Sequence, residues 1–300
     1  SRMAQRAKAS KRTRSAKKRT AHRAPSRRGS RTDPFARLER LARNLWWTWN
    51  PDAKRLFESL DPALWRAEHH NPLETIADLE PVRRESLAHD ARFLDALTGV
   101  EKKLDAYLGA KTWYPKTASA KQKKMRVAYF CMEYGLHESL PLYAGGLGIL
   151  AADHIKSASD LGIPLVAVGV LWRFGYYRQE ILSDGEVRVL YPRSEFDRLP
   201  VTDTGKSIRV PIGRSEVHAK IWRLDVGRVP VYLLDTDVPA NKPADRALTH
   251  HLYGGDNEYR TPPEVLLGIG RLLAVPYTPL TLPTIHPLYT SLFAATSKKH

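Results

Sequence analysis

The sequence predicts an α/β fold, in which a helical N-terminal module precedes a domain of strands and helices. The main evidence is residues 143–161, where three glycines stand directly before apolar residues at helical spacing. Gly162 then provides a C-cap, and Pro164 prevents the helix from continuing. The following residues, 165–171, form an unbroken apolar run of the kind found in buried strands. A helix followed at once by a buried strand is typical of an α/β domain.

Residues 1–32 differ in composition from the rest of the chain. They contain 13 Lys and Arg and no Asp or Glu, whereas the remaining residues carry 35 basic and 32 acidic side chains. The formal net charge of +16 therefore comes mainly from this segment. Because so little apolar content cannot form a core, we expect a disordered basic tail. We favour a solvated extension, and non-specific contact with polyanions is the alternative.

The single cysteine, Cys131, excludes an internal disulfide and indicates a reducing compartment. It lies in an apolar strand, so we interpret it as a buried thiol and not as a nucleophile. No apolar run reaches the roughly 18 residues of a membrane span, and no signal-peptide core is present. We therefore expect a cytoplasmic protein without a membrane partner. The histidine pairs at 69–70 and 250–251 have no acid or cysteine at ligand spacing, so we predict no metal site.

Residues 33–110 form the predicted helical module. Asp33 can cap a helix with Pro34 in its first turn, and apolar residues follow at helical spacing as far as Trp49. Trp46 and Trp49 share one helix face, which favours packing in a core over stacking on sugar rings. Further helices are predicted at residues 52–60, 61–68, 76–79 and 81–107.

Residues 111–125 form a polar connector, after which we assign an α/β domain to residues 126–270. Asp184 and Gly185 fit the turn of a hairpin that joins residues 176–182 to residues 186–190. The other segments with strand patterns are residues 127–131, 208–212, 217–224 and 228–234.

The glycines at positions 145, 146 and 148 allow three interpretations. They could form a tight turn that needs glycine only for its backbone angles. They could belong to a dinucleotide fingerprint, since residues 146–151 fit G-x-G-x-x-A, but no strand ends directly before Gly145 and no acid ends the following strand. They could also form a phosphate-binding loop, because the first backbone N–H groups of a helix are unpaired and lie at the positive end of its dipole. The flanking residues favour the phosphate loop.

Four segments carry a resemblance to a known family: residues 130–154, 157–179, 226–237 and 252–260. They include the Ala-Gly-Gly-Leu-Gly loop, the sequence Trp-Arg-Phe-Gly-Tyr-Tyr-Arg-Gln and the sequence Gly-Gly-Asp-Asn. In this order they resemble the α-glucan (glycogen, starch or maltodextrin) phosphorylases, and specifically the shorter prokaryotic branch with a helical N-terminal module. The resemblance extends over residues 35–270.

The resemblance implies both a fold and an activity. These enzymes are glycosyltransferases of the GT-B type, with two α/β domains that face each other across a cleft, the first of them Rossmann-like. They transfer glucosyl units from an α-1,4-glucan to orthophosphate and release glucose 1-phosphate. Their pyridoxal phosphate is bound to a lysine of the second domain, and its phosphate relays the proton.

The resemblance also implies which residues bind substrate. One group corresponds to the loop whose backbone N–H groups point towards the phosphates and the sugar: Gly145, Gly146, Leu147 and Gly148. Asp256 and Asn257 correspond to the gating loop at the glucosyl site, and Glu133 is expected to line the same pocket. No catalytic residue and no metal ligand is implied in this chain.

After Gly270 the sequence departs from the family. Residues 271–300 contain four prolines and no acid, so we expect a divergent, irregular tail. The second domain and its cofactor lysine are missing, and we expect an N-terminal fragment that is inactive alone. Two alternatives stay open: a non-catalytic module that binds glucan or polyanions, and part of a glycogen-synthase-like glucosyltransferase. The Asp256-Asn257 motif favours the phosphorylase.

Overall fold

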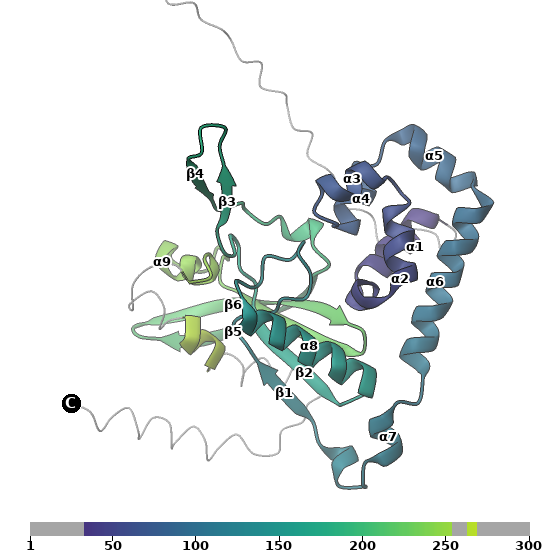
Figure 1. Cartoon of the computed structure of the whole chain (residues 1–300). Helices are drawn as coiled ribbons and strands as arrows, with labels where there is room; N and C mark the ends of the chain where they lie inside the picture. Colours follow the sequence, from purple (N-terminus) through teal and green to yellow (C-terminus); the bar gives the residue numbers. More distant parts are fainter. Residues whose placement is uncertain (1–32, 254–262, 269–300) are drawn as a thin grey trace, which may run out of the picture.

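The structure is a computed structural model that describes residues 33–253 and 263–268. A group of helices forms one side of the molecule, and a sheet with one long helix against it forms the other (Figure 1). The predicted combination of a helical N-terminal part with an α/β part is confirmed. The predicted tails, 1–32 and 271–300, lie outside the described residues, as do Asp256 and Asn257.

The N-terminal helices follow one another closely. Proline stands in the first turn of each of the first five α-helices, where its missing N–H group costs no hydrogen bond. Asp33 accepts a hydrogen bond from the Phe35 backbone amide (3.1 Å), so the predicted cap is confirmed. The elements are α1 (Pro34–Ala42), η1 (Leu45–Trp49), α2 (Pro51–Glu58), α3 (Pro62–Ala67), α4 (Pro72–Asp78), α5 (Pro81–His89), α6 (Ala91–Gly109), α7 (Trp113–Thr117) and η2 (Gln122–Lys124).

Two helices predicted as continuous are interrupted. The helix expected to reach Trp49 ends at Ala42, because the Asn44 side chain accepts a hydrogen bond from the Trp46 amide (3.0 Å) and begins a separate 3₁₀ turn. The same side chain exchanges two hydrogen bonds with the backbone of Gly227 (2.9 and 3.0 Å), which fixes this break against the strands. The helix expected over residues 81–107 is divided at Asp90, whose carboxylate caps α6.

The main sheet has five strands in the order β1-β2-β7-β6-β5. Strands β1, β2 and β7 are parallel to one another. Strand β6 pairs antiparallel with β7, and β5 pairs antiparallel with β6, so the sheet is mixed. The predicted hairpin at Asp184-Gly185 is confirmed as β3 (Arg178–Ile181) and β4 (Val187–Leu190), which project away from the sheet (Figure 1). The sheet strands are β1 (Val127–Phe130), β2 (Leu165–Val170), β5 (Thr202–Ile212), β6 (Ser215–Val226) and β7 (Val229–Asp235).

Helix α8 (Gly146–Leu161) connects β1 to β2, and its predicted C-cap Gly162 adopts the left-handed conformation at φ 70°. Strand β2 is buried along its whole length, as its apolar run predicts. The remaining short elements are η3 (Phe196–Arg198), α9 (Pro243–Arg246) and η4 (Ala247–Thr249), and residues 263–268 are helical.

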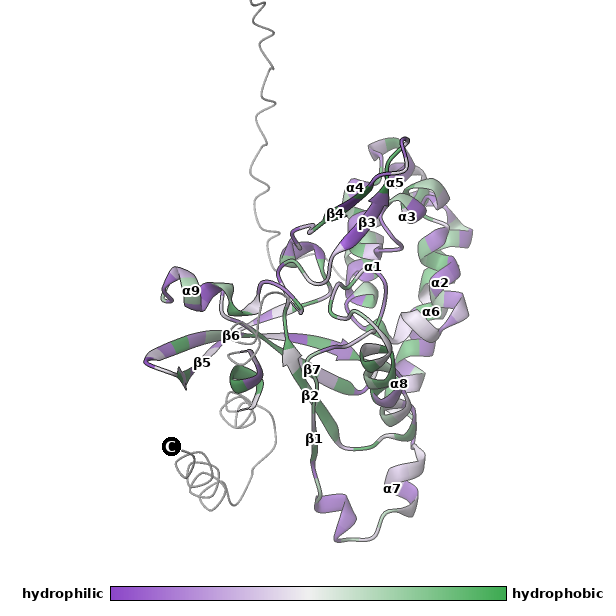
Figure 2. Ribbon diagram, turned by 60° about the vertical axis from the view of Figure 1, so that its left-hand side comes forward, coloured by the Kyte–Doolittle hydropathy of each residue, from purple (hydrophilic) through white to green (hydrophobic). Residues whose placement is uncertain are grey.

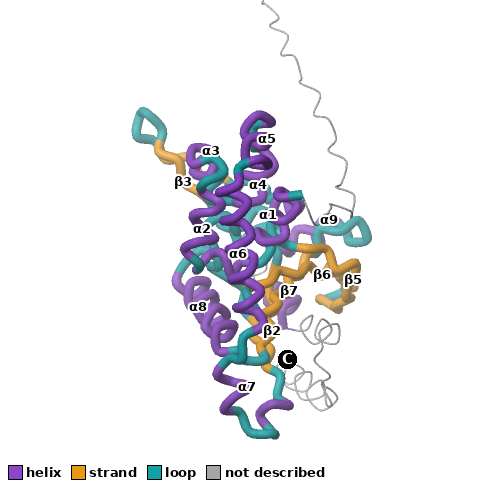
Figure 3. Tube along the Cα trace, turned by 90° about the vertical axis from the view of Figure 1, so that its right-hand side faces the viewer, coloured by secondary structure: helices purple, strands orange, loops and turns teal. Residues whose placement is uncertain are grey.

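One large core joins the helices to the sheet. It contains Trp46, which is buried as predicted, and also Trp47, together with side chains of α8, β2 and β7. Trp49, predicted to share the buried face with Trp46, is only partly buried and packs against this core. A smaller cluster covers the opposite face of the sheet and includes Leu266. Apolar residues accordingly concentrate on the central strands, and the helices lie to one side of them (Figures 2 and 3). Within the described ranges, no helix combines the length and apolar character needed to cross a membrane.

Candidate functional site

The candidate site lies at the beginning of α8, directly after the loop that connects β1 to this helix. Gly145 is the N-cap residue of this helix, and it has no side chain that could occupy the first amides. Gly146 and Leu147 are exposed, and within the described part of the chain their backbone amides have no hydrogen-bond acceptor. Gly148 is buried, and its amide donates to the carbonyl of Gly145 (3.1 Å). Two open amides at the positive end of a 16-residue helix can bind an anion or a sugar hydroxyl.

Glu133 lies beneath this loop and is only 2% exposed. Its Oε2 accepts hydrogen bonds from the amides of Ala144 (2.8 Å) and Gly145 (3.4 Å), and its Oε1 accepts one from the Tyr253 hydroxyl. Because both oxygens of this buried carboxylate accept hydrogen bonds, Glu133 holds the loop in place. The residue predicted to line the pocket thus contacts the loop backbone from below.

The glycines of the loop have different steric roles. A Cβ atom added to Gly148 would lie 2.4 Å from Cβ of Tyr143 and 3.1 Å from Oε2 of Glu133. A Cβ atom added to Gly145 or Gly146 would meet nothing within 4 Å among the described residues. Gly148 is therefore required by the packing of the protein, whereas Gly146 leaves space open at the helix start.

Tyr253 was not singled out from the sequence, although it stands inside the 252–260 motif. It has a positive φ of 60°, which is uncommon for a tyrosine. The segment before it is fixed by a hydrogen bond from the Leu252 amide to the Gly175 carbonyl (2.9 Å). Tyr253 therefore brings the end of this described segment to the carboxylate that holds the glycine loop. The predicted gating residues Asp256 and Asn257 follow it in sequence but lie outside the described residues.

Comparison with known proteins links this site to a family. Residues 32–140 match a family described as a protein of unknown function (DUF3417). The chain is 42% identical over 252 residues to glycogen phosphorylase of Mycobacterium tuberculosis, which covers 80% of this chain and 29% of that protein. The chain is a homologue of the glycogen and maltodextrin phosphorylases. Maltodextrin phosphorylase of Thermococcus litoralis is 40% identical over 262 residues (84% of this chain, 31% of that protein), and glycogen phosphorylase of Aquifex aeolicus is 36% identical over 242 residues (79% and 34%).

The chain thus spans about a third of the length of these phosphorylases. The family resemblance implies pyridoxal phosphate, whose lysine has to be desolvated to react at neutral pH. Within the described residues no lysine side chain is buried. Lys156 is half-buried, which lowers its pKa, but its amine donates to the Leu136 carbonyl (3.1 Å) and lies over the Trp49 ring. The described residues of this phosphorylase homologue therefore do not fit the cofactor.

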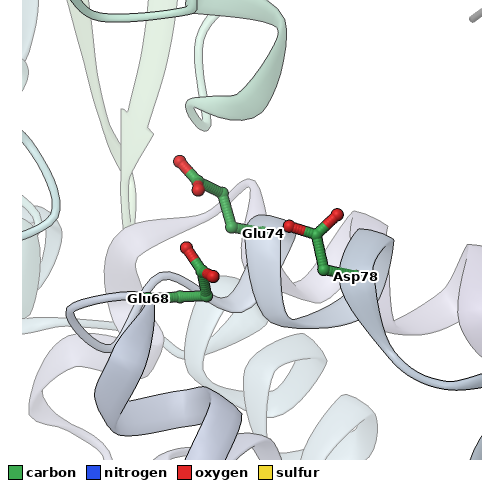
Figure 4. Close-up of side chains that lie close together, drawn as sticks. All are labelled: Glu68, Glu74 and Asp78. Carbon is green, nitrogen blue, oxygen red and sulfur yellow. The ribbon is translucent and has the colours of Figure 1, made fainter. Parts of the chain in front are cut away.

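Three carboxylates meet where α4 follows the end of α3: Glu68, Glu74 and Asp78 (Figure 4). Each offers an oxygen within 4.8 Å of the others. Arg198 lies on this group, 3.0 Å from Asp78 and 3.8 Å from Glu74, and supplies opposing positive charge. Burial, followed by the hydrogen bond with Glu68, raises the pKa of Glu74 to about 7. We interpret the group as a salt-bridge network that shares a proton.

One histidine of each pair lies near an acid from another segment of the chain. His70 contacts Glu138, and His250 Nε2 lies 3.7 Å from Asp237 Oδ2. Among the described residues, the group of side chains close enough to share a metal ion consists of Glu68, Glu74 and Asp78 and includes no histidine of either pair. Cys131 is buried, and burial raises the pKa of its thiol, which agrees with the predicted core role.

Proposed function

We propose that this chain forms the N-terminal part of a cytoplasmic α-1,4-glucan phosphorylase, which transfers glucosyl units to orthophosphate and releases glucose 1-phosphate. The observation that carries the proposal is the 40–42% identity to a glycogen phosphorylase and a maltodextrin phosphorylase over at least 80% of the chain. Three of the four motifs, residues 130–154, 157–179 and 226–237, include parts of β1, α8, β2 and β7, which supports this assignment.

In this proposal the start of α8 binds the reacting groups. The open amides of Gly146 and Leu147 donate hydrogen bonds to phosphate or sugar oxygens, and the helix dipole favours the negative charge that develops there. Gly146 lacks a side chain so that the substrate can approach the backbone. Asp256 and Asn257 contact the glucosyl unit, and Glu133 keeps the loop amides in position.

The remaining groups of the proposed site come from a second, GT-B type domain. That domain supplies the lysine that binds pyridoxal phosphate and the basic groups that bind orthophosphate. Holding two reactants in the correct geometry can contribute roughly 7–11 kcal/mol to catalysis. The 300-residue chain supplies only one side of the cleft and cannot hold both reactants in this geometry. We therefore expect the chain alone to be inactive.

A second candidate function concerns the basic residues 1–32 only. Their 13 positive charges favour non-specific contact with a polyanion such as DNA. Binding of this kind weakens steeply with salt and disappears when residues 1–32 are deleted. Binding that survives the deletion would exclude this function for the tail.

The experiment is a chimera in which residues 33–253 replace the matching part of the Mycobacterium tuberculosis glycogen phosphorylase. The chimera is assayed with glycogen, orthophosphate and pyridoxal phosphate, and the 300-residue chain is assayed in parallel. We expect glucose 1-phosphate from the chimera and none from the chain alone. A chimera that unfolds cooperatively and binds the cofactor, yet forms no product, would contradict the proposal.

A further inference from the structure

A cavity separate from the glycine loop lies where β2 and β7 end. Both strands run in the same direction, and the residues after their carboxyl ends meet at one edge of the sheet. Ligands of open α/β sheets are commonly bound at this edge. The cavity there has a volume of about 330 Å³. Its lining includes three arginines, an acid, a histidine and an aromatic ring: Arg173, Arg193, Arg246, Asp237, His250 and Phe174.

Two buried nitrogen atoms of this cavity lack a hydrogen-bond partner among the described residues, whereas Arg173 Nη1 donates to the Ser194 carbonyl (3.4 Å). Arg173 Nε and His250 Nε2 are buried, and neither has a partner among the described residues. Both point to the same oxygen, Oδ2 of Asp237, but at 3.6 and 3.7 Å they are too far for a hydrogen bond. A second ion pair of Arg173, with Asp235, is also long at 3.6 Å. Buried donors normally have an acceptor, so the cavity has unused capacity for one.

Positive charge exceeds negative charge in the cavity. Arg246 binds Oδ1 of Asp237 with two nitrogens (2.8 and 2.6 Å), so that carboxylate is already committed. Arg193 is exposed, and no ion pair holds it among the described residues. Three guanidinium groups thus face two carboxylates, those of Asp237 and Asp235. An arginine fork matches the geometry of phosphate oxygens.

The cavity also has a flat apolar wall. The Phe174 ring stacks on His251 with 4.8 Å between ring centroids and 13° between planes. On the other side, the Arg173 guanidinium lies 3.6 Å from the centroid of the Phe196 ring, which fixes its orientation. An aromatic ring beside arginines suits a phosphate group that carries a small organic part.

We propose that this cavity binds a small phosphate-bearing ligand. The guanidinium groups of Arg193, Arg246 and Arg173 bind the phosphate oxygens, and the organic part, where present, lies against Phe174. Free orthophosphate and a hexose phosphate share this chemistry. The cavity has no lining residue in common with the glycine loop at the start of α8, so the proposal goes beyond the proposed function and does not depend on it.

Binding of inorganic phosphate to the 300-residue chain tests the proposal, by calorimetry at constant ionic strength. Glucose 1-phosphate and glucose form parallel arms. We expect saturable binding of inorganic phosphate, and tighter binding of glucose 1-phosphate if the ring contacts Phe174. Arg193→Gln is the main variant, because this exposed side chain has no ion pair with a described residue whose loss could disturb the fold. It should weaken binding about tenfold, as should Arg246→Gln.

Three controls exclude other anion sites. Arg66→Gln removes one exposed positive charge from α3, outside the cavity, and should leave the affinity unchanged. Gly146→Val blocks any phosphate bound at the glycine loop, and deletion of residues 1–32 removes the basic tail. The part of the binding that Arg193→Gln weakens should persist in both variants. The proposal is overturned if no saturable binding occurs, if Arg193→Gln and Arg246→Gln bind as the wild type does, or if Gly146→Val or the deletion abolishes binding.

Discussion

The hydroxyl of Tyr253 donates a hydrogen bond to Oε1 of Glu133, although the two residues are 120 positions apart. The other oxygen of the same carboxylate accepts from the amides of Ala144 and Gly145. One buried side chain therefore connects the start of the glycine-rich helix with the segment that precedes Asp256 and Asn257. Glu133, and not the glycines themselves, thus joins the glycine loop to Tyr253.

This relationship predicts a coupling between two variants. Tyr253→Phe removes one hydrogen bond and should lower the free energy of unfolding by about 1 kcal/mol. Glu133→Gln replaces an acceptor by a donor next to the loop amides and should cost about 1–3 kcal/mol. Because both changes affect one network, the double variant should lose less than the sum of the two. Urea denaturation of the four proteins measures this, and strictly additive losses would contradict a shared network.

Gly148 and Gly146 should respond differently to the same substitution. Gly148→Ala places a methyl group against Tyr143 and Glu133 and should destabilise the chain by roughly 1–3 kcal/mol. Gly146→Ala meets open space and should change stability by less than about 1 kcal/mol in either direction. Denaturation midpoints compare the two variants directly, and equal losses would contradict an open helix start at Gly146.

His137 should make the protein less stable in acid. Burial lowers the pKa of its imidazole to about 4, and the ring lies 4.7 Å from that of Trp47. Between pH 6.5 and about 4 the unfolded chain binds this proton more readily than the folded chain. The contribution is thus fully present above pH 6.5 and is lost as the pH falls to about 4, by roughly 3 kcal/mol at most.

His137→Asn is the matched variant for this prediction, because its side-chain oxygen can still accept the hydrogen bond from the Ser139 amide. Its free energy of unfolding should fall less than that of the wild type between about pH 7.5 and about pH 4.5. Parallel losses in the two proteins would show that His137 titrates normally.

Glu74, in contrast to His137, should make the protein less stable as the pH rises. Its pKa of about 7 lies above the ordinary 4.5, so the folded protein holds this proton more tightly than the unfolded chain does. The contribution is present below pH 4.5 and is lost as the pH rises to about 7. Glu74→Gln, which imitates the protonated form, should be more stable than the wild type by about 1 kcal/mol near pH 8 and equal to it near pH 4.5. Thermal unfolding at both pH values tests this, and a constant difference would exclude titration of Glu74.

Local signals in the sequence predicted much of the fold. The cap at Asp33, the left-handed Gly162, the buried run of β2 and the turn at Asp184-Gly185 each depend on neighbouring residues, and all are present in the structure. The interruption at Asn44 could not be predicted in this way. Its partner, Gly227, is 183 positions away, and a local pattern contains no information on such a contact.

The same distinction applies to the candidate site. The glycine loop and its helix were predicted, because glycines before a periodic apolar segment are a local pattern. The position of Glu133 under the loop, the participation of Tyr253 and the arginine cavity all depend on contacts between distant segments. Asp256 and Asn257 stay predictions, since they lie outside the described residues.

The central claim is that the open amides at the start of α8 bind the reacting substrate, and Gly146→Val in the active chimera tests it most directly. The Cβ of a valine there meets no atom of the described residues within 4 Å, so the fold should persist, whereas its methyl groups obstruct the approach of phosphate or sugar to the backbone. Initial rates of glucose 1-phosphate formation and melting temperatures are measured for both chimeras. We expect nearly complete loss of turnover at an unchanged melting temperature. Turnover close to that of the parent chimera would contradict it and would reduce the loop to a structural turn.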